Sequence, residues 1–184
     1  MEAFRLLYLK YYQKVFSTCL LILKNSALAE EATQEAFLKA YTNLHTLREP
    51  EKFGAWVAAI GSKQAINMYN RNKKSLTIGE EEKILHIKNI WGEQWDDYEP
   101  CQKYLEKETN QEIRRAIYLL DPLLSQMVIL KYYWSLTDQE IADYLQVPLG
   151  TVKSSLFRAR KTLEIELKKI YGDLFSCKEE NGDR

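Results

Sequence analysis

The sequence predicts an all-α protein made of two small helical domains joined by an acidic linker. Apolar residues recur at spacings of three and four in the long segments outside the linker, which is the period of an amphipathic helix. Seven Gly and four Pro in 184 residues leave few turn signals, and no segment has the pattern of a β-hairpin. Charge also changes along the chain, and we expect domains at 1–74 and 109–171, a linker at 75–108 and a tail at 172–184.

Charge is unevenly distributed, although the formal net charge of the chain is zero. Residues 1–74 contain eleven Lys and Arg against six Asp and Glu, net +5, whereas residues 75–108 contain four against nine, net −5. Residues 109–184 balance at eleven each, with their cations concentrated in the helix near residues 153–161. A neutral total therefore does not exclude nucleic acid as a partner, because locally basic segments supply the attraction.

Composition argues against several classes of protein. Cys19, Cys101 and Cys177 are far apart and form no CxxC pair, so neither a zinc site nor a disulfide framework is suggested, and no cofactor is expected. The opening MEAFRLLYLKYY lacks the basic n-region and the cleavage site of a signal peptide. No apolar run approaches the ~20 residues that span a bilayer. We therefore expect a cytoplasmic protein without membrane insertion.

Two amphipathic helices begin the N-terminal domain. The first covers about residues 2–23 and has a wide apolar face. The second covers about residues 28–44, with candidate buried positions at Ala32, Phe37, Leu38, Tyr41 and Leu44. Its other face carries Glu30, Glu31, Gln34, Glu35 and Lys39. Glu31 and Glu35 stand one turn apart, which slightly disfavours an isolated helix, so this face is either reserved for a basic partner or simply solvated.

A loop at His45–Pro50 precedes a third helix, which starts near Glu51. Gly61 weakens its middle, because Gly costs about 1 kcal/mol relative to Ala inside a helix. The far end of the helix is basic, with Lys63, Arg71, Lys73 and Lys74. Trp56 fits a core position better than a base-stacking platform, although its ring would serve unpaired bases presented there.

The acidic segment 75–108 also contains Trp91 and Trp95, which a purely flexible linker would not need. We expect a short helix at about 80–91 and irregular chain beyond it. Helices resume near Tyr104, where one is marked by Ile113, Ala116, Ile117 and Leu120. The next begins at Asp121-Pro122.

Residues 137–163 have the pattern of two short helices joined by a tight turn. Thr137 is a suitable N-cap, and Glu140 three residues later completes a capping box. Gln146-Val147-Pro148 interrupts the pattern, and Pro148 is tolerated at the start of the second helix. Gln146 is expected to adopt a left-handed backbone conformation, which is mildly costly for a residue with a Cβ.

The second helix of this pair has two contrasting faces. Its apolar stripe consists of Val152, Leu156, Ala159 and Leu163. The opposite face and its flanks carry Thr151, Lys153, Ser154, Phe157, Arg158, Arg160 and Lys161. No acidic residue occurs between residues 146 and 163. A helix of this kind suits the major groove of DNA, whereas a core helix with a solvated basic face is the simpler alternative.

Taken together, these segments resemble the extracytoplasmic-function (ECF) group of bacterial RNA polymerase sigma factors, within the sigma-70 family. LYLKYYQKVF, AEEATQEAFLKAY and FGAWVAAI resemble the family's region 2, and the segment from LDPLLSQ to GTVKSSLFRARKTL resembles its region 4. Helix-turn-helix pairs occur in many regulators. The upstream QEAFLKAY and FGAW segments therefore distinguish this family from the others.

The resemblance implies three functional surfaces and their partners. Core RNA polymerase would be bound through Glu31, Gln34, Glu35, Phe37 and Leu38. The −10 promoter element would be opened and its unpaired bases held through Trp56, Lys63, Asn67, Asn70, Arg71, Lys73 and Lys74. The −35 element would be read in duplex DNA through Thr151, Lys153, Ser154, Ser155, Phe157, Arg158, Arg160 and Lys161. An anti-sigma protein is a further implied partner.

Four positions depart from the family's common pattern. Lys63 and Asn67 stand where Asn and Asp are common, Ser155 where Arg is common, and Gln146 where the turn commonly has Gly. These differences bear on the details of −10 and −35 recognition and leave the overall pattern intact.

The predicted function is that of a promoter-specificity subunit and not of an enzyme, because His45 and His86 are isolated and no nucleophile–base spacing occurs. One alternative is a stand-alone helix-turn-helix regulator that uses residues 1–74 for dimerisation or sensing. Another is a module that sequesters a regulator and never binds DNA. Promoter-dependent transcription tests the first alternative, and salt-dependent DNA affinity tests the second.

Overall fold

The structure is a computed structural model, and it describes residues 2–47, 49–72, 113 and 115–171. Within these ranges the chain forms helices and turns and no β-strand, which confirms the predicted all-α class. The predicted linker, the helix expected within it at 80–91 and the tail at 172–184 lie outside the described residues.

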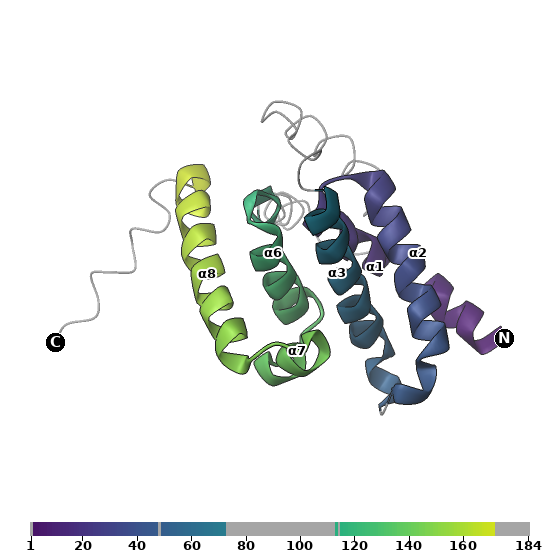
Figure 1. Cartoon of the computed structure of the whole chain (residues 1–184). Helices are drawn as coiled ribbons and strands as arrows, with labels where there is room; N and C mark the ends of the chain where they lie inside the picture. The colour runs from purple at the N-terminus through teal and green to yellow at the C-terminus, as the bar shows by residue number, and fades with distance from the viewer. Residues whose placement is uncertain (1, 48, 73–112, 114, 172–184) are drawn as a thin grey trace, which may run out of the picture. The chain divides into compact units, whose positions relative to one another are not determined.

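Three long helices form the N-terminal bundle: α1 (Glu2–Leu23), α2 (Ser26–Thr42) and α3 (Phe53–Asn72) (Figure 1). Asn25 caps α2, because its side chain accepts a hydrogen bond from the backbone N–H of Leu28 at 3.0 Å. Between α2 and α3 the predicted loop contains two 3-10 turns, η1 (Leu44–Thr46) and η2 (Pro50–Lys52). The three predicted N-terminal helices are thereby confirmed.

Small side chains let the three helices approach closely. The buried face of α2 carries Ala29, Ala32, Ala36 and Ala40. Gly61 lies where α3 meets this face, since a Cβ added there would stand 3.0 Å from Val15 Cγ1 and 3.4 Å from Ala36 Cβ. Gly61 is therefore a packing residue, and its weak helix propensity is offset by close contact among all three helices.

The structure corrects the predicted buried face of α2. Ala32 and Phe37 are buried as expected, but Leu38 is 68% exposed, Tyr41 is 52% exposed and Leu44 is also exposed. The prediction followed the large apolar side chains, whereas α2 faces its neighbours with its alanines and Phe37. Leu38 and Tyr41 consequently form an apolar surface on the outer side of the helix.

The C-terminal half continues with α6 (Pro122–Val128), the π-helical segment η4 (Ile129–Tyr133), α7 (Asp138–Leu145) and α8 (Leu149–Tyr171). Asp121 caps α6 by accepting a hydrogen bond from the backbone N–H of Leu123 at 3.0 Å. The start predicted at Asp121-Pro122 is confirmed. Helix α8 has 23 residues and extends well beyond residue 163, so it is not the short helix that was predicted.

The helices group into two compact units. The first contains α1, α2 and α3 together with α6, η4, α7 and the part of α8 up to Phe157. The second contains residues 113 and 115–120, which are helical from 115 to 119, and the rest of α8. The helix-turn-helix therefore packs, through α7 and the start of α8, in the same unit as the N-terminal bundle.

Candidate nucleic-acid and polymerase interfaces

The turn between α7 and α8 is defined by two local signals. At the start of α7 the capping box predicted for Thr137 and Glu140 is present, with hydrogen bonds in both directions. At its end Gln146 adopts the left-handed conformation, with φ 59° and ψ 47°, as predicted. The backbone N–H of Val147 then donates to the carbonyl of Ala142 at 3.0 Å, which closes the turn.

Helix α8 has the two faces predicted for a DNA-reading helix. Val152, Leu156 and Ala159 are buried, and Leu163 is half-buried. The opposite face is exposed at Thr151, Lys153, Ser154, Phe157, Arg158, Arg160 and Lys161. Phe157 is notable because it is an aromatic residue that is 67% exposed. An exposed face of hydroxyls, cations and one aromatic ring can contact phosphates, base edges and a thymine methyl group.

Ser155 differs from the other predicted −35 residues, because it is only 5% exposed. Its neighbours in sequence, Ser154 and Leu156, are exposed and buried respectively, so Ser155 lies on the inner side of the helix. The structure therefore does not place Ser155 on the exposed face with the other seven residues.

Three of the predicted −10 residues on α3 line a pocket of about 400 Å³. Trp56, Lys63 and Asn67 line it, together with Asn43 and Thr46 from the chain that follows α2. Trp56 is 9% exposed and its ring lies 6.0 Å from that of Phe53, so it belongs largely to the core, as preferred from the sequence. Asn70 and Arg71 are exposed further along α3, and Lys73 and Lys74 lie outside the described residues.

Residues of α2 and α7 complete the pocket wall. Lys39 Nζ donates to Gln64 Oε1 at 2.8 Å, which fixes the amide of Gln64 beside the pocket. Lys63 Nζ donates to Gln146 Oε1 at 3.0 Å across a sequence separation of 83 residues. The second of these bonds joins a predicted −10 residue to the turn of the helix-turn-helix.

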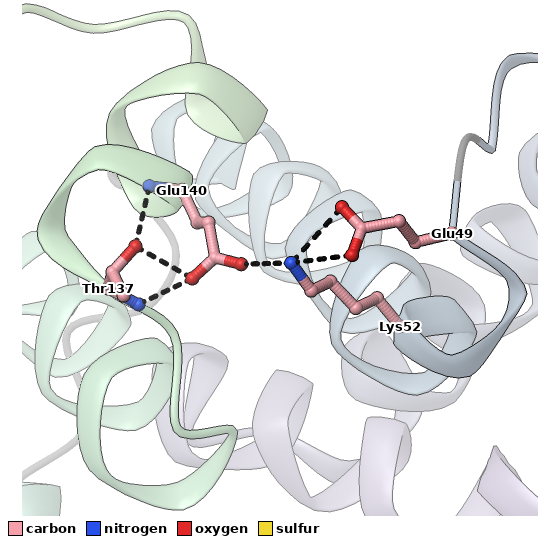
Figure 2. A network of polar contacts seen from close by, with 4 residues as sticks. All are labelled: Glu49, Lys52, Thr137 and Glu140. Carbon is pink, nitrogen blue, oxygen red and sulfur yellow. Dashed lines mark hydrogen bonds and ion pairs between the residues drawn. The ribbon is translucent and has the colours of Figure 1, made fainter.

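A polar network joins α7 to the chain before α3 (Figure 2). Lys52 Nζ lies 2.9 Å from Glu140 Oε1 and 2.9 Å from Glu49 Oε2. Glu140 Oε2 accepts hydrogen bonds from the Thr137 backbone N–H at 2.8 Å and from its hydroxyl at 2.7 Å. The bonds from Lys52 and Thr137 lower the pKa of the Glu140 carboxyl to about 2. Glu140 thus serves two roles, as the capping-box residue of α7 and as the ion-pair partner of Lys52.

Two buried hydrogen bonds lie in the same unit, and the sequence did not reveal them. Trp134 Nε1 donates to Thr18 Oγ1 at 2.9 Å, and Gln126 Nε2 donates to Ser62 Oγ at 3.0 Å. Lys14 Nζ lies over the Trp134 ring, 4.4 Å from its centroid, and burial lowers the pKa of this lysine. The sequence could have indicated a buried hydrogen bond at Thr18, because Thr18 is a polar residue on the apolar face of its helix.

The predicted polymerase-binding residues of α2 divide into two groups. Glu31, Gln34 and Leu38 are exposed and Glu35 is half-buried. Phe37 is buried, because its ring packs on those of Tyr8 at 4.8 Å and Phe4 at 6.4 Å. Phe37 is therefore unable to contact a partner directly. Its packing against α1 holds α2 in place, and α2 carries the exposed residues.

The part of the chain that the structure describes contains neither a metal-binding cluster nor a helix able to span a membrane. No group of three or more His, Cys, Asp or Glu in it could hold a metal ion. None of its helices combines the length and apolar character needed to cross a bilayer. Burial raises the pKa of the Cys19 thiol to about 12, which makes this cysteine a poor nucleophile.

Comparison with known protein families gives two matches in this chain. The profile of Sigma-70 region 2 matches residues 7–75, and that of Sigma-70, region 4 matches residues 110–163. The first match contains α2 and α3, and the second contains α6, α7 and the exposed face of α8.

This chain is similar to several bacterial sigma factors over most of their length. The chain is 27% identical over 164 residues to the ECF RNA polymerase sigma factor SigW of Bacillus subtilis, covering 87% of this chain and 86% of that protein. It is 28% identical to the RNA polymerase sigma-H factor of Pseudomonas aeruginosa and to the ECF RNA polymerase sigma-E factor of Escherichia coli, each covering 92% of this chain and 88% of the relative.

A solved structure shares the fold. The sigma factor RpoE from Bartonella quintana, crystallised in complex with the anti-sigma factor NepR, aligns with a TM-score of 0.59 at 18% identity. The alignment covers 91% of this chain and 98% of the other.

Proposed function

The chain belongs to the ECF group of the sigma-70 family, and on that premise we propose that it binds core RNA polymerase and directs it to promoters as a transcription initiation factor. The observation that carries this proposal is the presence, in one chain, of a region 2 bundle and a region 4 helix-turn-helix with an exposed, acid-free face. The protein is accordingly a binding subunit and not an enzyme. We divide it into domains at 1–74 and 109–171, an acidic linker at 75–108 and a tail at 172–184.

The exposed face of α8 would read the −35 element. Arg158 and Lys161 are suited to the O6 and N7 acceptors of guanine, and Phe157 to a thymine methyl group. Lys153 and Arg160 on the flanks are better placed for phosphates, which position a protein without specifying sequence. Since Ser155 is buried, it would support the helix and leave base contact to its neighbours.

The pocket on α3 would hold an unpaired base of the −10 element. Trp56 offers part of its ring, and the side chains of Lys63 and Asn67 offer hydrogen bonds. Opening duplex DNA costs about 1.4 kcal/mol of stacking per base-pair step, which a small domain cannot supply over several steps. Melting is therefore expected only in the presence of polymerase.

The outer face of α2 would bind polymerase. Leu38 and Tyr41 expose apolar surface on the helix that also carries the exposed side chains of Glu31 and Gln34, and exposed apolar patches with polar rims commonly mark protein interfaces. By analogy with the solved relative, we propose an anti-sigma protein as a second partner. These partners imply a cytoplasmic location.

A binding experiment tests the polymerase surface. Leu38→Ala should lower the affinity for core polymerase about tenfold or more, as expected for an anchor residue at an interface. Leu9→Ala is the matched control, because Leu9 is exposed to a similar extent on α1. Equal loss from the two variants, measured by titration with labelled core polymerase, would contradict the assignment of α2.

A transcription experiment separates base reading from phosphate contact. Arg158→Ala should cost about 1–3 kcal/mol on promoters with the preferred base and relax selection at one −35 position. Lys153→Ala should weaken all promoters alike and reduce the salt dependence of DNA binding. If Arg158→Ala lowers every member of a promoter-variant panel equally, Arg158 is not a base reader.

A further inference from the structure

The pocket beside α3 has the size and the lining of a small-molecule site. Its volume of about 400 Å³ falls within the range of about 300–1,000 Å³ that is usual for such sites. Trp56 and Tyr144 contribute aromatic surface to its wall, and Lys39 and Lys63 contribute two cations. None of the described residues that line it is acidic. A pocket of this kind suits a ligand that has both a planar ring and an anionic group.

Two glutamine side chains in the pocket wall have a fixed orientation. Gln64 Oε1 accepts a hydrogen bond from Lys39 Nζ at 2.8 Å, and Gln146 Oε1 accepts one from Lys63 Nζ at 3.0 Å. Because a lysine ammonium group only donates, the oxygen of each amide must face its lysine. The Nε2 group of each glutamine, with its two N–H donors, therefore remains for a ligand. Gln64 is only 5% exposed, so a ligand that covers its amide without offering an acceptor would bind poorly.

The acceptors of the wall lie on more exposed side chains. Asn43 Nδ2 donates to the backbone carbonyl of Lys39 at 2.8 Å, which leaves its Oδ1 as an acceptor. The Thr46 hydroxyl donates to the carbonyl of Asn43 at 2.8 Å and retains its lone pairs. Asn67 offers both a donor and an acceptor. All three side chains are exposed and can be hydrated, whereas the buried amide of Gln64 presents a donor.

A base that carries carbonyl acceptors matches this wall. Guanine presents O6 and N7 as two adjacent acceptors, whereas adenine presents N7 and the amino group N6 at the same edge. The amino group of adenine would meet the amide donor of Gln64, and neither group would have a partner. The phosphate of a nucleotide would in turn be attracted by Lys39 and Lys63, since ammonium groups form strong charge-assisted hydrogen bonds with phosphate.

We propose that this pocket binds a free guanine nucleotide in the protein without polymerase. The amides of Gln64 and Gln146 donate to guanine O6 and N7, and the ammonium groups of Lys39 and Lys63 balance the phosphate. The nucleotide site stands on the pocket alone. Its competition with an unpaired −10 base for the same space rests in addition on the proposed function.

Titration of the full chain with two nucleotides of similar size tests the site. GMP and AMP carry the same phosphate and differ at the base edge, so the wild type should bind GMP about tenfold more tightly than AMP. Isothermal titration calorimetry measures both affinities. Equal affinities would overturn the selection of guanine, and no binding of either nucleotide would overturn the site.

Gln64→Glu tests the amide that is proposed to read the base. The carboxylate keeps an acceptor for Lys39 and replaces the Nε2 donor with an oxygen, which can accept from adenine N6. The preference for GMP should therefore disappear or invert. Gln13→Glu is the control, because it makes the same substitution on α1, outside the pocket. A tenfold preference for GMP that persists in Gln64→Glu would contradict the assignment.

Lys63→Met tests the phosphate contact separately from the base. It removes the cation and keeps an unbranched side chain, so it should weaken GMP and AMP alike by about fivefold or more and leave their ratio unchanged. Lys10→Met is the control, since Lys10 is exposed on α1 and does not line the pocket. Wild-type affinities in Lys63→Met would overturn the placement of the phosphate.

A guanine base could also come from an unpaired DNA strand, and a short single-stranded oligonucleotide with one guanine distinguishes the two sources. If the oligonucleotide binds with a preference that depends on Gln64 while GMP does not bind, the pocket reads a strand and the free-nucleotide proposal fails. If the chain does not bind core polymerase, the proposed function fails, whereas the GMP titration still decides whether the nucleotide site exists.

Discussion

Gln146 has two structural roles: its backbone forms the turn between α7 and α8, and its side chain accepts a hydrogen bond from Lys63. Its position after Leu145 predicts a left-handed turn, and the structure has it at φ 59°. The sequence could not predict its bond to Lys63, because a separation of 83 residues leaves no periodic signal. Local backbone geometry is thus predictable from residue type, whereas the partner of an exposed side chain is not.

The backbone cost at Gln146 can be measured. Gln146→Gly should raise the free energy of unfolding by up to about 1 kcal/mol, because glycine adopts the left-handed region without strain. Urea denaturation at neutral pH measures the change, with Gln139→Gly as the control inside α7, where the same substitution should destabilise by about 1 kcal/mol. A loss of stability at both positions would show that the turn is not strained.

The Glu140 network should make stability depend on pH in acid. The Glu140 carboxyl has a pKa of about 2 in the folded protein against an ordinary 4.5, so its contribution is complete above 4.5 and is lost as the pH falls towards 2. The stability advantage of the wild type over Glu140→Gln should therefore shrink between pH 5 and pH 2.5. Urea denaturation of both proteins measures this advantage, because the contributions of all other carboxyl groups to the free energy of unfolding are the same in both and cancel in the difference. A difference in free energy that stays constant from pH 5 to pH 2.5 would contradict the assigned pKa. The advantage is small and falls with added salt, since the pair is partly exposed.

At the scale of elements, periodicity predicted which segments are helical better than which face is buried. The helices near 2–23 and 53–72 and the pair in 137–163 are present. On α2, however, the large residues Leu38 and Tyr41 point outward, because the small residues allow close packing on α1 and α3. A sequence pattern that counts only large apolar residues misassigns such a face.

Helix α3 offers a test of this packing. Gly61→Ala should destabilise the protein by about 1 kcal/mol or more, because the added methyl group meets Val15, Cys19 and Ala36 at 3.0–3.4 Å, outweighing its better helix propensity. Gly150→Ala is the control, since nothing lies within 4 Å of the added Cβ. The control should gain a few tenths of a kcal/mol from propensity alone. A gain of stability at both positions, measured by thermal and urea denaturation, would contradict the close approach at Gly61.

At the scale of the whole molecule, the sequence contained enough to predict the family and the all-α class, through GTVKSSLFRAR and the upstream FGAW and QEAFLKAY segments. It did not predict that α6, η4 and α7 would join the N-terminal bundle in one unit. The buried hydrogen bonds between these helices are made by isolated polar side chains, which give no pattern in the sequence. Which side chains bond to each other, Trp134 with Thr18 and Gln126 with Ser62, depends on the tertiary arrangement. The predicted site residues of α3 and α8 remain predictions until DNA binding is measured.

The central claim is that this chain directs core RNA polymerase to promoters, and run-off transcription on a randomised promoter library tests it most directly. We predict transcripts only when the protein is added to core polymerase, with selected sequences enriched at both a −35 and a −10 element. Transcripts that are independent of the protein, or no transcripts from a folded protein with active core polymerase, would contradict the claim.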